Sequence, residues 1–194
     1  MKKRNIIAAL LSVFILITAT ACGKADKEGD KDKKVVKVGV VGESNEMWDP
    51  VIEELAKEGI EIKLISFTDY STPNRALNDG ETDLNAFQHH AYLNEEIKNN
   101  GYKIQGIGDK FISAMNIYSN KVSSVDEIGE GAKIAVPNDA TNEGRALKVL
   151  EAAGLIKLKE DAGDSPDKTA IVENKLNIEL VEVDAANVYS LLPD

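Results

Sequence analysis

The chain has 194 residues, which is enough for one large domain or two small ones. Its 33 acidic residues outnumber its 23 basic residues and give a formal net charge of −10 at pH 7, an acidic balance that disfavours binding to nucleic acid. The single cysteine cannot form an intramolecular disulfide, so a disulfide framework is excluded.

Residues 1–21 have the features of a secretory signal peptide. A basic start precedes an almost continuous apolar run from Ile6 to Thr18, and small residues follow. The apolar run is too short, and lacks the basic stop-transfer flank, to favour a permanent membrane span. We therefore expect the folded part of the protein to lie on the extracytoplasmic side of the membrane.

Cys22 stands directly after the small residues that end this segment, and the junction resembles the lipobox of bacterial lipoproteins. That resemblance implies a diacylglyceryl-modified cysteine at the mature N-terminus; an ordinary cleaved or uncleaved signal peptide is the alternative. Cleavage before Cys22 leaves 20 basic against 33 acidic residues, a net charge of −13. Residues 22–34 mix both charges without a large apolar side chain and predict a disordered tether.

Two strands with a helix between them are predicted after the tether. Residues 35–41 are rich in β-branched side chains, which is typical of a nearly fully buried strand of a parallel sheet, and residues 60–67 alternate as a second strand. The intervening helix ends at Gly59. No glycine-rich dinucleotide motif or phosphate-binding loop follows the first strand, so no cofactor is expected.

Tyr70 comes directly after the second predicted strand. Ser71 then offers an N-cap hydroxyl and Pro73 suits a first helical turn, so a short helix is predicted that ends at Asp79 and Gly80. Because the helix follows the strand at once, Tyr70 is expected in the loop at the carboxyl end of the strand.

A second group of polar and aromatic side chains follows the strand predicted at residues 83–87. His89 and His90 come after that strand, and the apolar spacing beyond them predicts a helix that ends at Gly101. Ligands of open α/β sheets bind outside the carboxyl ends of parallel strands. The residues expected to face one crevice there are Tyr70, His89, His90 and Tyr92.

Other interpretations of these aromatic residues stay open. Loop aromatics can have packing roles alone, although several large side chains with polar tips coincide here where burial does not require them. Trp48 lies near the same predicted edge. It either lines the crevice or packs a helix start onto the sheet.

The second half of the chain continues the α/β pattern. Strands are predicted at residues 102–108, 111–118, 133–136 and 178–183, short helices at residues 124–127 and from residue 184. A longer helix is predicted with Thr141 or Asn142 as its N-cap and Ala153 at its end.

Arg145 is expected in the first turn of that helix. A cation there opposes the helix dipole at a cost of about 0.3 to 1 kcal/mol unless an anion occupies the site. A guanidinium beside free backbone N–H groups suits a carboxylate. The alternative is a structural ion pair with Asp139 or Glu143.

Three blocks of sequence, in order, resemble the MetQ/NlpA family of methionine-binding lipoproteins, which are substrate-binding components of ABC importers. The blocks are residues 67–77, Phe-Thr-Asp-Tyr to Pro-Asn-Arg-Ala-Leu; residues 85–89, Asn-Ala-Phe-Gln-His; and residues 134–147, Ile-Ala-Val-Pro-Asn-Asp to Gly-Arg-Ala-Leu. The resemblance implies an α/β, two-lobed periplasmic-binding-protein-like fold with an amino acid enclosed between the lobes. We place the first lobe at residues 35–118 and part of the second at residues 119–194.

The resemblance also implies roles for individual residues. Tyr70, Phe87, His89 and Tyr92 would surround a thioether side chain, and Arg145 would bind the α-carboxylate; His90 and Asn142 complete the predicted site. The expected partners are L-methionine or a related amino acid, an ABC permease and, through the lipid anchor, the cell membrane. Family members continue for several tens of residues, so a truncated chain with an incomplete second lobe is expected.

Two other functional classes were weighed. The adjacent His89 and His90 suggest a metal-importing lipoprotein, but neighbouring residues of a strand point to opposite faces and no third histidine is present. An enzyme is not expected, because Asp69 with His89 does not make an arrangement of nucleophile, base and orienting group.

Overall fold

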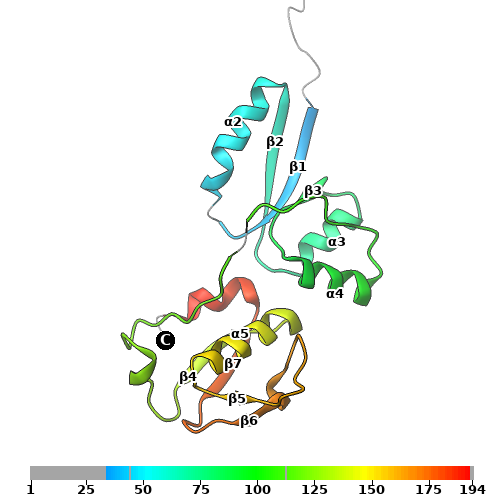
Figure 1. Ribbon diagram of the computed structural model, residues 1–194. Helices are drawn as coiled ribbons and strands as arrows, with labels where there is room; N and C mark the ends of the chain where they lie inside the picture. The colour runs from blue at the N-terminus through cyan, green and yellow to red at the C-terminus, as the bar shows by residue number, and fades with distance from the viewer. Residues whose placement is uncertain (1–33, 44, 112, 193–194) are drawn as a thin grey trace, which may run out of the picture. The chain divides into compact units, whose positions relative to one another are not determined.

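The computed structural model describes residues 34–43, 45–111 and 113–192, which form a mixed α/β structure (Figure 1). The predictions about the signal peptide, Cys22 and most of the tether lie outside these residues. Among the described residues, no helix is long and apolar enough to cross a membrane.

A three-stranded parallel sheet opens the described chain, as the sequence predicts. Strand β1 (Lys34–Val41) lies between β2 (Ile60–Phe67) and β3 (Leu84–Asn85). The prediction of a nearly fully buried β1 is wrong for its first half: Val35 is 42% exposed, and burial begins at Val38. The reason is that helix α2 (Asp49–Lys57) has no buried residue and covers this part of the sheet only loosely.

Two helices follow the strands whose carboxyl ends were predicted to carry the site. Helix α3 (Thr72–Asn78) comes after β2, with Pro73 in its first turn, and helix α4 (His90–Asn100) comes after β3. Gly101 ends α4 with a φ of 70°, a left-handed conformation that glycine adopts without strain. A 3₁₀ turn, η1 (Glu46–Trp48), precedes α2.

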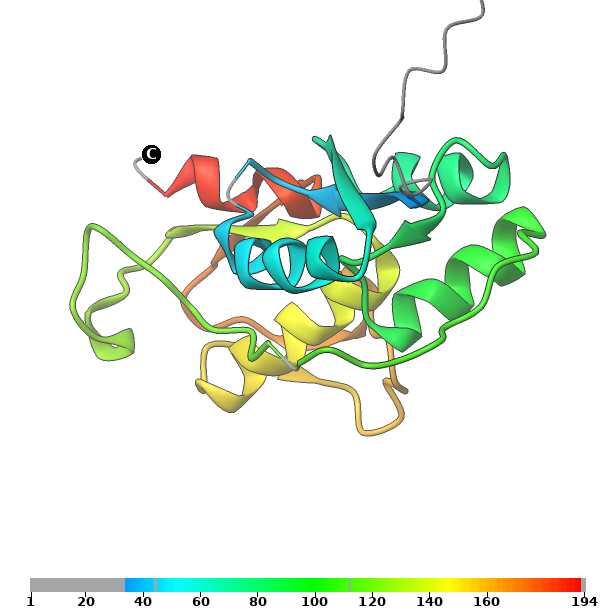
Figure 2. The ribbon, with the colours of Figure 1, turned by 90° about the horizontal axis from the view of Figure 1, so that it is seen from above.

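Residues 101–124 correct the sequence analysis. The strands predicted at residues 102–108 and 111–118 are not present in the described part of this segment, which Figure 2 shows as a long irregular connection in green. Ile107 is 77% exposed and Tyr118 70%, whereas Met115 and Ile117 are partly buried. A pattern of β-forming residues makes a strand only when a neighbouring strand supplies hydrogen bonds, and here none pairs with it.

A second α/β region follows the 3₁₀ turn η2 (Val125–Glu127). Strand β4 (Lys133–Pro137) pairs in parallel with β7 (Glu179–Val183), and helix α5 (Ala140–Ala152) connects onward from β4. Two short antiparallel strands, β5 (Lys157–Leu158) and β6 (Ile171–Glu173), lie between α5 and β7, with the 3₁₀ turn η3 (Lys168–Ala170) before β6. A further 3₁₀ turn, η4 (Ala185–Leu191), follows β7. The buried core cluster of this region comprises Val136, Ala146, Leu147, Leu150, Leu155, Ile156, Leu158, Ala170 and Ile178.

Candidate functional site

Four aromatic side chains predicted to share one site lie together in the structure. We call Tyr70, Phe87, His89 and Tyr92 the aromatic cluster. The ring centroids of Tyr70 lie 5.5 Å from Phe87 and 5.8 Å from Tyr92, and those of Phe87 and His89 lie 6.1 and 6.4 Å from Tyr92. All four pairs meet edge to face, the arrangement that aromatic quadrupoles favour.

Asp69 shapes the loop that carries Tyr70. Its carboxylate accepts hydrogen bonds from the backbone N–H groups of Ser71 at 2.9 Å and Thr72 at 2.7 Å. Burial alone would raise the pKa of Asp69, but these bonds and those from the two hydroxyls lower it below its ordinary value. Ser71 makes no side-chain cap bond, so Asp69 takes the capping role that was predicted for Ser71.

His89 performs two structural tasks in the cluster. Its Nδ1 accepts a hydrogen bond from the backbone N–H of Tyr92 at 3.1 Å and so caps α4. Its Nε2 lies 3.1 Å from Oδ1 of Asn142, a residue of α5. Because Nδ1 is an acceptor, the ring proton is on Nε2, which donates to Asn142.

Helix α5 begins earlier than predicted, because Asp139 and not Thr141 or Asn142 is its N-cap. The Asp139 carboxylate accepts from the backbone N–H of Asn142 at 2.9 Å. Arg145 is therefore the sixth residue of α5 and lies in its second turn, where the helix dipole acts less strongly than in the first.

Arg145 is held by neutral oxygens. Its Nη1 donates to Oδ1 of Asn142 at 2.9 Å, and its Nη2 lies 3.3 Å from the carbonyl oxygen of Ser113. Within the described chain no ion pair joins Arg145 to Asp139 or Glu143, so the alternative of a structural ion pair is not supported. The Asn142 oxygen, shared by Arg145 and His89, links the guanidinium to the aromatic cluster.

A cavity of about 330 Å³ adjoins the cluster. The residues that line it include two tyrosines and three carboxylates. The full lining is Tyr70, Ser71, Tyr92, Glu96, Asn138, Asp139, Asp184 and Ala185. Burial, and then the nearby carboxylates, raise the pKa of both tyrosines, while Arg145 opposes this shift at Tyr70. The phenols therefore stay neutral hydrogen-bonding groups at physiological pH.

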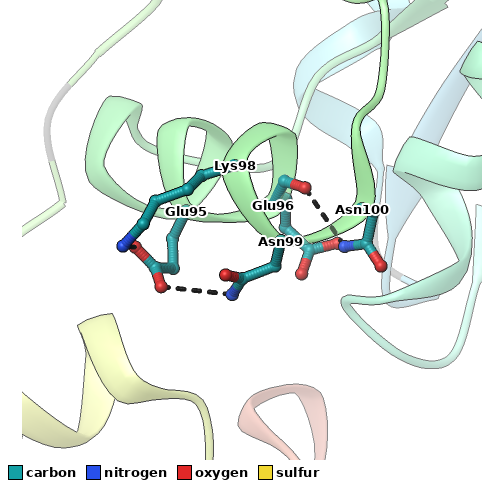
Figure 3. A network of polar contacts seen from close by, with 5 residues as sticks. All are labelled: Glu95, Glu96, Lys98, Asn99 and Asn100. Atoms are coloured by element: carbon teal, nitrogen blue, oxygen red, sulfur yellow. Dashed lines mark hydrogen bonds and ion pairs between the residues drawn. The ribbon is translucent and has the colours of Figure 1, made fainter.

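Helix α4 also borders a smaller cavity of about 210 Å³, lined by Tyr92, Glu95, Glu96, Asn99, Asp139, Ala140 and Thr141. Figure 3 shows that Glu95 accepts a hydrogen bond from Asn99 at 3.1 Å and pairs with Lys98 at 3.6 Å. Asn100 donates to the backbone oxygen of Glu96, and burial raises the pKa of the Glu96 carboxyl. Glu95 is thus satisfied within its own helix, whereas Glu96 lines both cavities.

Two predicted candidates have contacts elsewhere. His90 is 65% exposed, and its Nε2 lies 2.6 Å from Oδ1 of Asp109 on the connecting segment. Trp48 lies beneath the ammonium of Lys110, 5.4 Å from its ring centroid. The described residues contain no group of three or more histidine, cysteine or acidic side chains that could hold a metal ion.

Several residues of the site were not found from the sequence. Glu96 and Asp184 line the larger cavity, and the side-chain amides of Asn74 and Gln88 bond to each other across the two segments that carry the aromatic cluster. A signal existed for Gln88, which stands between Phe87 and His89. Asn74 lies within the block at residues 67–77 that resembles the family, but it is one of several polar side chains in a short helix, and nothing else distinguished it from a solvated residue.

Comparison with known proteins identifies relatives over most of the chain. The model of the family described as NlpA lipoprotein matches residues 36–194. A D-methionine-binding lipoprotein MetQ from Yersinia pestis is 40% identical over 190 residues, which are 97% of this chain and 69% of the relative.

Solved structures agree with the sequence relatives. A crystal structure of the methionine-binding protein MetQ is 41% identical with a TM-score of 0.78, over 84% of this chain and 67% of the other. A nutrient-binding protein from Burkholderia cenocepacia, bound to methionine, is 41% identical with a TM-score of 0.75, over 82% of this chain and 68% of the other. The match to a crystal structure of a protein from Staphylococcus aureus covers only 63% of that protein. The present chain therefore spans about two thirds of the length of these relatives.

Proposed function

The chain belongs to the NlpA lipoprotein family, and we propose that it is a substrate-binding lipoprotein of an ABC importer whose ligand is methionine or a closely related amino acid. Relatives named as methionine-binding proteins, and one named as the substrate-binding protein of a methionine transporter, support this proposal. The observation that carries it is the meeting of an aromatic cluster with a guanidinium that has no carboxylate partner among the described residues.

The aromatic cluster suits a thioether. Sulfur in a methionine side chain is polarizable and makes favourable contacts with aromatic ring edges, worth about 0.3 to 1.5 kcal/mol each. Tyr70, Phe87 and Tyr92 present edges and faces at right angles to one another, so a flexible apolar side chain can meet several of them at once.

Arg145 suits the α-carboxylate. A planar guanidinium binds a carboxylate through two parallel hydrogen bonds, and such charge-assisted bonds are about twice as strong as neutral ones. Arg145 donates in the described chain only to the oxygens of Asn142 and Ser113, and the weaker of these contacts is 3.3 Å long. An entering carboxylate can replace that longer bond without breaking an ion pair.

The α-ammonium would be attracted to the carboxylates of the larger cavity. Glu96, Asp139 and Asp184 line that cavity together with Tyr70 and Tyr92. Asp139 and Asp184 are held by helix N-cap bonds and so remain fixed in place. A zwitterion would then lie with its negative end toward Arg145 and its positive end toward these acids.

The remaining parts of the proposal concern architecture and location. Residues 35–118 would form the first lobe and residues 119–194 part of the second. Cys22 would carry the acyl anchor that holds the protein on the extracytoplasmic face of the cell membrane, from which it delivers ligand to the permease. Incorporation of labelled fatty acid into the wild type, and its loss in Cys22→Ala, tests the anchor; failure of the wild type to incorporate label refutes it.

Binding is tested by calorimetry with L-methionine and by mass spectrometry of ligand retained after mild purification. We expect L-methionine to bind more tightly than L-leucine and L-alanine, because only its side chain combines length with a thioether. A protein that retains and binds no amino acid, or that prefers L-alanine, contradicts the proposal.

A further inference from the structure

A network of three side-chain amides joins the two segments that carry the aromatic cluster. Asn74 donates from Nδ2 to Oε1 of Gln88 at 2.8 Å, and Gln88 donates from Nε2 back to Oδ1 of Asn74 at 2.6 Å, so the two amides form a closed pair. Asn85 adds a contact from its Nδ2 to the same Asn74 oxygen at 3.3 Å and a bond to the carbonyl of Pro73 at 2.8 Å.

The amide pair is shielded from solvent. Asn74 is 0% exposed, and Gln88 and Asn85 are partly buried. A buried amide that loses its partner keeps the full cost of its desolvation, so a satisfied pair allows only a narrow range of positions for the segments it joins. Burial raises the pKa of the nearby Glu96 carboxyl on α4, and the Asn74 amide opposes that shift.

Asn74 and Gln88 belong to the two segments that carry the aromatic cluster. Tyr70 lies four residues before Asn74, and Phe87 and His89 flank Gln88 in the sequence. Hydrogen bonds between Asn74 and Gln88 therefore set the distance between the Tyr70 loop and the Phe87 to His89 loop. The ring centroids of Tyr70 and Phe87 lie 5.5 Å apart.

We propose that the Asn74–Gln88 amide pair is a positioning element that fixes the spacing of the aromatic cluster and thereby sets its selectivity among apolar amino-acid side chains. This inference rests on the proposed function for its ligand but not for its structural effect. The rings already touch one another edge to face, so a ligand side chain meets them as one surface. A surface whose rings are held in fixed positions fits an unbranched thioether and rejects a branched side chain, whereas a surface whose rings can shift discriminates less.

The test uses two variants of the pair and one control. Gln88→Met keeps the length of the side chain but removes both hydrogen bonds, and the double exchange Asn74→Gln with Gln88→Asn keeps the summed length and the amide chemistry. The control is Asn174→Ala. The Asn174 side-chain amide also makes two hydrogen bonds, both to the backbone of Ile178, and it lies outside the aromatic cluster.

Two measurements are made on each protein. Calorimetry with L-methionine and L-leucine gives the ratio of the two affinities, and hydrogen–deuterium exchange without ligand reports on residues 70–74 and 86–92. In Gln88→Met we expect L-methionine affinity to fall about tenfold, the ratio to narrow, and exchange to rise in both segments. The double exchange restores the ratio at least partly, and Asn174→Ala leaves the ratio and both segments unchanged.

The outcomes separate the two proposals. If Gln88→Met keeps the wild-type affinity ratio, or if its two segments exchange no faster than those of Asn174→Ala, the amide pair is not a positioning element. If the wild type binds no amino acid, the proposed function fails, while the exchange data still decide whether the pair holds the cluster together.

Discussion

The two α/β regions of the chain are held together by different means. In the N-terminal region, residues 34–100, the buried side chains combine a few apolar residues with the polar Asn74 and Thr82. The C-terminal region, residues 133–183, has a larger core cluster of aliphatic residues around α5, and that helix also buries the polar Thr141, Asn142 and Glu143. The N-terminal region therefore depends more on directional hydrogen bonds, and the C-terminal region more on close packing of apolar groups.

This difference matches what each region contributes to the site. The N-terminal region carries the aromatic cluster, whose ring spacing must be set by directional contacts such as the Asn74–Gln88 pair. The C-terminal region carries Arg145 and Asn142 on α5, a helix held by a core in which Leu147 is fully buried. Substitutions should therefore affect affinity, selectivity and stability to different extents in the two regions.

The largest effect is expected on ligand affinity for Arg145→Ala. Removing one partner of a desolvated charge pair leaves the other unpaired, at a cost of about 2 to 5 kcal/mol of binding free energy. Arg145→Lys should restore only part of this, because an ammonium cannot form two parallel bonds to a carboxylate. Calorimetry with L-methionine measures both.

Arg75→Ala is the matched control, since Arg75 is an exposed residue of α3 outside the cluster. We expect it to bind L-methionine as the wild type does. If Arg145→Ala also binds normally, the C-terminal region does not supply the carboxylate site, and the proposed division of roles fails.

The second prediction concerns stability. Leu147 is 0% exposed within the aliphatic core, and Leu147→Ala should lower the free energy of unfolding by about 2 to 5 kcal/mol. Val40→Ala, at 2% exposure in the N-terminal sheet, removes fewer atoms and should cost less. Chemical denaturation of both variants makes the comparison. A larger loss from Val40→Ala would mean that the N-terminal region also depends mainly on apolar packing.

The sequence predicts most of the fold because its strongest signals are local. The alternation at residues 60–67 and the glycine at position 101 predict β2 and the end of α4 correctly. The strands predicted at residues 102–108 and 111–118 are wrong, because whether an apolar run pairs depends on a partner strand that the run itself does not specify.

The grouping of the aromatic side chains in the candidate site could also be predicted, because it depends on where the strands end. The aromatic side chains of the cluster follow strand ends, and the parallel topology brings those ends together. Asp139 was missed as the cap of α5, since an acid two residues before a threonine competes with that threonine for the role. His90 was grouped with His89 by adjacency, yet its contact is with Asp109 on the connecting segment.

The third prediction tests how tightly the amide network packs against β1. A methyl group at Gly39 would collide with Oδ1 of Asn85, and it would also lie 3.2 Å from the Phe67 ring. Gly39→Ala should therefore cost about 1 to 3 kcal/mol of stability through overpacking and displace Asn85 from Asn74. Thermal unfolding measures the cost. Gly144→Ala, which would meet the backbone of Ser165, is the matched variant in the C-terminal region.

The two variants should differ in their effect on the aromatic cluster. Only Gly39→Ala disturbs the amide network, so only it should raise hydrogen exchange at residues 86–92. Equal exchange in both variants would show that the network tolerates movement of Asn85.

The smallest effects are expected in the pH dependence of stability, where one carboxyl of each region, Asp69 and Glu143, should contribute with opposite sign. In the N-terminal region, hydrogen bonds from Ser71 and Thr72 lower the pKa of Asp69, although burial opposes them. A carboxyl whose pKa is lowered on folding contributes stability above its ordinary pKa, and this is lost as the pH falls through the lowered value. Asp69→Asn should therefore flatten the acid limb of a stability profile measured by denaturation.

Glu143 should act in the opposite direction in the C-terminal region. Glu143 is only 7% exposed, and its Oε1 has no hydrogen-bond partner among the described residues. Glu182 lies beside it and is itself paired with Lys168 at 2.8 Å. Burial, and then Glu182, raise the pKa of Glu143. The folded protein therefore holds a proton that the unfolded chain releases, so stability falls as the pH rises from the ordinary glutamate pKa through the raised value.

Glu143→Gln keeps a donor toward Glu182 and cannot ionise, so its stability should exceed that of the wild type above this pH range and should not fall across it. A wild-type profile that is flat through this range, or unchanged by Glu143→Gln, would mean that the buried carboxyl is ionised and that Lys168 compensates it.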